Sequence, residues 1–212
     1  MFGMVLNRWG ELPENEARLA MMKEQVEIFA DVLQDDNGFM RHAQDWPGYD
    51  ESVYWARGNS WVVASLADYL RIGAERGEVD AEIEAIFLEH VGAISAVQDE
   101  ASRLWWTVLD RPEIEDNYTE TSASALVAYG MARAFRYGVL SGEAVEAARA
   151  AVAEIIADRI EYDDDGPFVT GVSLATDPWS LEEYLALPLG DDVNYGVGAV
   201  ILALIETSGL AD

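Results

Sequence analysis

Two tryptophans and an arginine lie close together in residues 52–70, where an apolar helical segment begins. They are Trp55, Arg57 and Trp61. Indole rings offer flat apolar surfaces, and a guanidinium group matches a carboxylate in two parallel hydrogen bonds. A sugar acid needs both features, because it has an apolar ring face and a carboxylate. The alternative is that both indoles belong to the core and that Arg57 caps a neighbouring helix, since aromatic residues at helical spacing usually build core.

Two histidines and a glutamate are further candidates for chemistry. His42 follows Gly38 in a loop, where the simplest interpretation is a solvated histidine. His90 falls within a helical pattern, and we interpret it as structural. Glu120 opens a helix rich in small residues, and at that position capping and a functional role are both open.

The elements that must position these residues are mainly helices. Apolar residues recur at intervals of three and four, which predicts amphipathic helices. The first ten residues have the pattern of a helix end whose beginning is missing. The other predicted helices cover residues 14–33, 62–70 with an end near Gly73 or Gly77, 79–97, 119–137, 141–160 with Ser141 as its cap, and 193–206. Three short aromatic extended segments lie between them, at residues 39–42, 103–109 and 163–169, and a loop rich in Pro and acids precedes the last helix.

These extended segments recur at an interval of roughly 65 residues, which is typical of repeated supersecondary units. Each unit is a helix pair followed by an acidic turn and a hairpin-like loop on one face. Small residues crowd segment 119–137, so we expect it in an inner layer, and we expect the charged segment 141–160 in an outer layer. The pattern predicts an all-α fold of the α/α-toroid type, with an open solenoid as the alternative. A ring of six such units needs nearly twice this length, so residues 1–212 should form a single domain containing about half a ring.

The composition is strongly acidic. Forty Asp and Glu face thirteen Lys and Arg, the formal net charge is −27, and Lys23 is the only lysine. Such a charge disfavours binding to nucleic acid and to anionic membranes. We predict a cytoplasmic protein adapted to high salt; an ordinary acidic protein is the alternative. The chain contains no cysteine, which excludes disulfides, thiolate metal sites and a cysteine nucleophile.

Four motifs, in this order, resemble the unsaturated rhamnogalacturonyl and glucuronyl hydrolases of glycoside hydrolase families 105 and 88. They are YWARGNSWVVASLADYL, LWWTVLDRP, YTETSASALVAYGMARAF and NYGVGAVILALIE, with DDNGFMRH upstream of the first. The resemblance covers essentially the whole chain and corresponds to the C-terminal portion of these enzymes. It implies an (α/α)6 toroid, in agreement with the repeat.

The resemblance implies a glycosidase that removes a 4,5-unsaturated uronic acid from oligosaccharides produced by polysaccharide lyases. An Asp protonates C4 of the enol ether, water adds at C5, and the resulting hemiketal opens and releases the next sugar. No metal and no organic cofactor is implied. Carried over to this chain, the resemblance implies that His42, Trp55, Arg57 and Trp61 bind the unsaturated uronyl oligosaccharide.

The sequence departs from the family pattern at two points. Tyr195 stands where the last motif is expected to contain a histidine. The catalytic Asp is expected just upstream of Met1, and no Asp or Glu precedes Glu11. We therefore expect the N-terminal part to be missing, no catalytic residue within the chain, and very low activity. Three acids are candidate substitutes that no geometric argument favours: Asp31, Asp45 and Asp50.

Two other functions are compatible with parts of the sequence. A non-catalytic helical module that binds acidic sugars or a partner chain would explain the missing Asp. A sugar epimerase on the same fold would need acid and base histidines, and His42 and His90 make a poor pair for that role. For the leading interpretation, half a ring would expose inner helices along two open edges, so we expect self-association through these edges.

Overall fold

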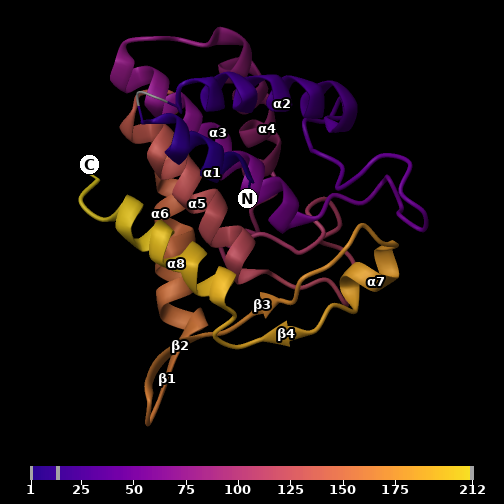
Figure 1. Ribbon diagram of the computed structural model, residues 1–212. Coiled ribbons are helices and arrows are strands. Elements are labelled where there is room, and N and C mark those ends of the chain that lie inside the picture. The colour runs from indigo at the N-terminus through magenta and orange to yellow at the C-terminus, as the bar shows by residue number, and fades with distance from the viewer. Residues whose placement is uncertain (1, 13–14, 211–212) are drawn as a thin grey trace.

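A computed structural model describes residues 2–12 and 15–210 of the chain. Four helices form one row in which each helix packs against the next (Figure 1). In order along the row they are α1 (Phe2–Gly10), α3 (Ala56–Arg76), α5 (Thr121–Arg136) and α8 (Asn194–Thr207). Their buried side chains form most of one continuous hydrophobic core.

Helices α3, α5 and α8 run in the same direction, because ion pairs join neighbouring helices start to start and end to end. Arg57 at the start of α3 faces Glu120 at the start of α5, with 3.5 Å between Nη1 and Oε1. Near the opposite ends of the same two helices, Asp68 pairs with Arg133. Arg133 also pairs with Glu206 near the end of α8, at 2.6 Å. The starts of α3, α5 and α8 therefore lie on one rim of the row.

A second row covers the outside of the first. Helix α2 (Ala17–Leu33) packs against α1, α4 (Ala81–Ser95) packs against α3, and α6 (Gly142–Glu154) packs against α5 and α8. This alternation of inner and outer helices confirms the predicted helix pairs. Closure of the row into a ring stays a prediction.

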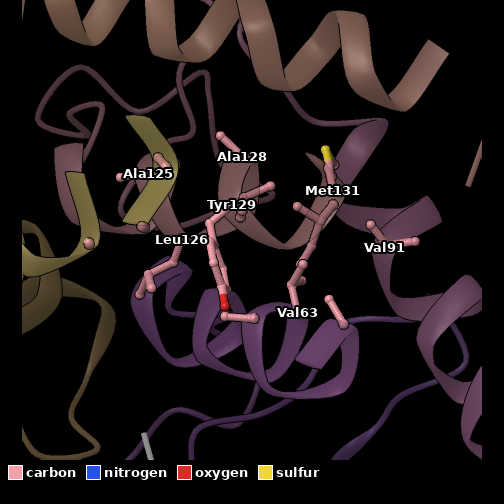
Figure 2. Packing of buried hydrophobic residues seen from close by; sticks show 14 of the residues in the cluster. Val63, Val91, Ala125, Leu126, Ala128, Tyr129 and Met131 are labelled. Atoms are coloured by element: carbon pink, nitrogen blue, oxygen red, sulfur yellow. The ribbon is translucent and has the colours of Figure 1, made fainter. Parts of the chain in front are cut away.

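Helix α5 is almost entirely buried, as its small residues predicted. A side chain at Gly130 would place its Cβ 2.6 Å from Val63 Cγ1, so glycine allows α5 to approach α3 closely. Figure 2 shows Tyr129 extending from α5 toward the helix that carries Val63. In α4, five of the six residues of the predicted apolar stripe are buried: Ile83, Phe87, His90, Val91 and Ile94.

The predicted end of α3 near Gly77 is accurate, but the helix starts at Ala56 and not at residue 62. The helix predicted over residues 141–160 is too long, because α6 covers only Gly142–Glu154. Helix α3 ends at Gly77, whose φ of 71° is a left-handed conformation that glycine adopts without strain. Ser141 occupies the N-cap position of α6, but its side chain makes no capping hydrogen bond. Helix α6 ends at Glu154 and continues as the π-helical turn η2 (Ile155–Arg159) before a strand begins.

The rim carries the short strands. Strands β1 (Ile160–Asp163) and β2 (Gly166–Val169) form the antiparallel hairpin expected near Gly166. Strands β3 (Val172–Ser173) and β4 (Leu189–Gly190) pair as a second ribbon, and α7 (Leu181–Leu185) lies between them. The other two extended segments form isolated bridges, for example between Trp55 and Val108. We predicted only a loop rich in Pro and acids where β3, α7 and β4 lie.

No helix in the described part of the chain combines the length and hydrophobicity that crossing a bilayer requires.

Candidate active site

Arg57 is buried at the rim, where α3, α5 and α8 begin. Its side chain is 4% exposed. Nη1 donates to the carbonyl oxygen of Ser173 at 2.6 Å, and Nη2 donates to that of Leu174 at 2.8 Å. Both terminal nitrogens therefore bind the backbone of the β3 segment, and a ligand carboxylate that reached Arg57 would have to displace these carbonyls.

Two aromatic rings lie against the Arg57 guanidinium. Its central carbon is 4.8 Å from the centre of the Trp55 ring and 4.7 Å from that of Tyr195. Such contacts stabilise a desolvated cation through the negative faces of the rings. The Tyr195 hydroxyl also donates to the carbonyl of Ser173 at 2.8 Å. The tyrosine that stands in place of the expected histidine thus contacts both Arg57 and its backbone acceptor.

Glu120 is the N-cap of α5 and is fully buried. One carboxylate oxygen accepts a hydrogen bond from the backbone N–H of Ala123, which confirms a capping role. The other accepts from the N–H of Ser173 at 2.9 Å and faces Arg57. The Ser122 hydroxyl lies 2.9 Å from both oxygens. Glu120 therefore ties the start of α5 to β3 and to Arg57.

An apolar cavity of about 320 Å³ opens between α1, α2 and α3. Three of the four predicted ligand-binding residues line it: His42, Trp55 and Trp61. Arg57 is not among the lining residues and lies against the Trp55 ring. The other lining residues are mostly apolar: Gly3, Leu6, Met22, Gln25, Val26, Phe29, Met40, Gly58, Val62, Ser65 and Leu66.

His42 is fixed by contacts on several sides. Its ring lies against Trp55, with 4.6 Å between the ring centres and 30° between the ring planes. Nδ1 is 2.6 Å from the hydroxyl of Tyr184, and the backbone N–H donates to the hydroxyl of Tyr49 at 2.9 Å. Burial lowers the pKa of His42 from 6.5 to about 4; the positive charge of Arg57 also lowers it, whereas Asp177 opposes the shift. His42 is therefore neutral near pH 7.

A family model described as Glycosyl Hydrolase Family 88 matches residues 1–210. The chain belongs to this family. The resemblance found in its motifs is thereby confirmed.

Two curated proteins and one solved structure illustrate what this family-88 chain is similar to. Protein Atu3128 of Agrobacterium fabrum is 33% identical, over 77% of this chain and 82% of that protein. An unsaturated 3S-rhamnoglycuronyl hydrolase of Formosa agariphila is 26% identical over 77% of this chain, and the match spans 41% of that enzyme. The crystal structure of a family-105 glycoside hydrolase from C. acetobutylicum is 25% identical, with a TM-score of 0.83, over 99% of this chain and 62% of that one. The fold is thus shared, while this chain is shorter than both hydrolases.

His90 is a core residue of the family-88 chain, as predicted. It is fully buried on α4, with Nδ1 2.9 Å from the carbonyl of Gly38 and Nε2 3.2 Å from that of Asn59. These contacts tie α4 to the loop before His42 and to α3. Among residues 2–12 and 15–210, no three His, Asp or Glu side chains converge as metal ligands would.

The contributions of Tyr184 and Ser173 were not predicted from the sequence. Both lie in the segment that we predicted to be a loop. Tyr184 contacts His42 and Ser173 contacts Arg57, each from more than a hundred residues away in the chain. The only local signal was the sequence SLEE at residues 180–183. It forms a capping box in which Ser180 and Glu183 bind each other's backbone N–H groups, and it starts α7.

Proposed function

We propose that this family-88 protein removes a 4,5-unsaturated uronic acid from the non-reducing end of oligosaccharides left by polysaccharide lyases. Family membership supports a glycosidase, and a relative named as an unsaturated 3S-rhamnoglycuronyl hydrolase supports this substrate class. The match spans less than half of that enzyme, so the activity is carried to this chain as a proposal. Family membership favours the hydrolase over the non-catalytic module.

The cavity beside Trp55 is the observation that carries this proposal. Trp61, Trp55 and His42 line one apolar space of about 320 Å³, which is large enough for a single sugar ring. The C4–C5 double bond flattens part of the uronate ring, and a flattened ring stacks well on an indole. Gln25 and Ser65 supply polar side chains on the wall of the same cavity.

The positive charge of Arg57 would attract the uronate carboxylate of the substrate. A carboxylate is a stronger acceptor for a guanidinium than a neutral carbonyl, because both partners are charged. A substrate that reached Arg57 would therefore exchange with the carbonyls of Ser173 and Leu174. Without that exchange, Arg57 still places a positive charge against Trp55 and next to the cavity.

The hydration reaction needs a proton donor. C4 of the enol ether takes up a proton, water adds at C5 and loses a proton, and the hemiketal then opens with release of the next sugar. Among the described residues, those lining the cavity include no Asp or Glu. Glu120 already accepts four hydrogen bonds or ion-pair contacts and is buried, so it is not free for this role.

Binding and turnover test the proposal separately. Unsaturated uronyl disaccharides should quench the tryptophan fluorescence of the protein in molar KCl, and saturated uronyl disaccharides should bind more weakly. Trp61→Ala should abolish the effect, whereas Trp9→Ala, on the exposed side of α1, should leave it unchanged. Turnover is followed by loss of the ultraviolet absorbance of the double bond. Absence of both binding and turnover would refute the proposal, and turnover would show that an acid within the chain donates the proton.

The row of inner helices also supports the proposal that this fold is an arc of an α/α toroid. Its two end helices, α1 and α8, expose large apolar side chains: Val5, Trp9, Ile201 and Ile205. Self-association through these edges stays a prediction, and sedimentation analysis in high and low salt would test it.

A further inference from the structure

Tyr184 reaches His42 from a distant part of the chain. Tyr184 lies in α7, is fully buried, and packs beside Trp55 with 6.2 Å between the ring centres. Its hydroxyl oxygen is 2.6 Å from His42 Nδ1 and 3.3 Å from the backbone nitrogen of Trp179. This hydroxyl therefore has two polar neighbours within hydrogen-bond distance.

The directions of these two hydrogen bonds follow from the chemistry of the groups. A backbone N–H can only donate, so Trp179 occupies a lone pair of the Tyr184 oxygen. The phenol proton then needs an acceptor, and His42 Nδ1 is the one that the described residues provide. Burial raises the pKa of Tyr184 well above its usual value, so the phenol keeps its proton at neutral pH. Nδ1 thus accepts, and the imidazole proton is on Nε2.

We infer that Tyr184 is a positioning residue that fixes His42 as the Nε2–H tautomer and so presents one hydrogen-bond donor to a ligand in the cavity. No hydrogen bond from Nε2 to any described residue competes with this role, and His42 lines the cavity. Stacking on Trp55 and the bond from the His42 backbone to Tyr49 fix the ring and its backbone. The identity of the ligand rests on the proposed function; the tautomer does not.

This arrangement decides what His42 recognises. Four polar or charged groups act on its ring: Tyr184, Tyr49, Arg57 and Asp177. With a neutral ring, His42 does not attract the uronate carboxylate by charge, and Arg57 is the cation close by. A single N–H matches a neutral acceptor, namely a hydroxyl or the ring oxygen of the bound sugar. Tyr184 would therefore contribute to specificity for the hydroxyl pattern of the substrate.

Nitrogen-15 NMR of the imidazole rings tests the tautomer without any ligand. The chain has only two histidines, so a spectrum of His42→Gln assigns the signals of His90. We expect His42 to have a protonated Nε2 and an unprotonated Nδ1. Tyr184→Phe should shift a large fraction to the Nδ1–H form, because the phenol proton no longer occupies Nδ1. The matched control, Tyr49→Phe, loses a hydroxyl that bonds to the backbones of His42 and Val53 and not to the imidazole, so it should leave the tautomer unchanged.

The outcomes separate this inference from the proposed function. Unchanged His90 signals in Tyr184→Phe would show that the core is intact. A fully Nε2-protonated His42 in that variant, or an Nδ1-protonated His42 in the parent protein, would overturn the positioning role. Where the tautomer shifts, the affinity for an unsaturated uronyl disaccharide should fall about two- to tenfold, the range for one lost hydrogen bond. Unchanged affinity would overturn the donor role, whereas a shifted tautomer with no binding by either protein would refute only the proposed function.

Discussion

The ring of Tyr195 lies 4.7 Å from the guanidinium carbon of Arg57, although the two residues begin different helices. Tyr195 stands where the family motif led us to expect a histidine. A protonated histidine beside Arg57 would add a like charge, whereas tyrosine adds a neutral ring face and a hydroxyl that bonds to Ser173. This substitution therefore joins α8 to the start of α3 and to β3.

Variants of Tyr195 separate the ring from its hydroxyl. Tyr195→Phe keeps the ring over Arg57 and loses one hydrogen bond, so we expect a loss of about 1 kcal/mol in the free energy of unfolding. Tyr195→Ala also loses the ring contact and its buried area, so we expect a loss of about 3 kcal/mol. Urea unfolding at constant KCl measures both. Equal losses in the two variants would contradict a role for the ring.

The Arg57–Glu120 pair leads to a second prediction. Arg57→Ala leaves Glu120 buried without its cation and the backbone carbonyls of residues 173 and 174 without their donors, so we expect a loss of about 3 kcal/mol in unfolding free energy. The double variant Arg57→Ala/Glu120→Gln removes the buried charge as well and should be more stable than Arg57→Ala alone. If the double variant is less stable by the sum of the two single losses, the residues are not coupled.

The same Arg57→Ala variant tests the predicted clamp in a form of the protein that turns over substrate. We expect KM for the unsaturated uronyl disaccharide to rise strongly, because the cation near the cavity is lost. A variant of similar stability but intact charge near the cavity, Tyr195→Ala, provides the comparison. An unchanged KM would place the carboxylate-binding group elsewhere.

Local features of the fold were readable from the sequence, and long-range ones were not. The apolar stripe of α4, the glycine end of α3 and the small residues of α5 each reflect a rule about one helix. Trp55, Trp61 and His42 were grouped through motifs, and they do share a cavity. The bond between Tyr184 and His42 joins residues 142 positions apart, through a helix of only five residues. No periodicity signals such a contact, because it depends on how the β3–β4 ribbon folds over the rim.

The depressed pKa of His42 predicts how stability depends on pH. The unfolded chain binds a proton at this residue near pH 6.5, while the folded protein does so only near pH 4. The unfolded state therefore binds more protons within this window. The contribution of His42 is fully present above about pH 6.5 and is lost as the pH falls toward about 4. We expect His42→Gln to lose less stability than the parent protein over this range. Parallel pH profiles of the two proteins in urea unfolding would contradict the shift.

The acidic composition predicts that salt stabilises the folded chain. A formal net charge of −27 creates repulsion that is larger in the compact state than in the unfolded one. At low ionic strength this repulsion extends over tens of ångströms, and molar salt shortens its range to about 3 Å. We expect the unfolding temperature to rise by more than about 4 °C between dilute buffer and molar KCl, which corresponds to roughly 1 kcal/mol for a chain of this size.

Sucrose at matched osmolality serves as the uncharged control, and an equal rise in sucrose would attribute the effect to solvent exclusion. The buried ion pairs of Asp68 and Glu206 with Arg133 should resist screening, because they are shielded from the ions. An unfolding temperature that does not change in KCl would therefore show that the surface repulsion is small and would contradict adaptation to high salt.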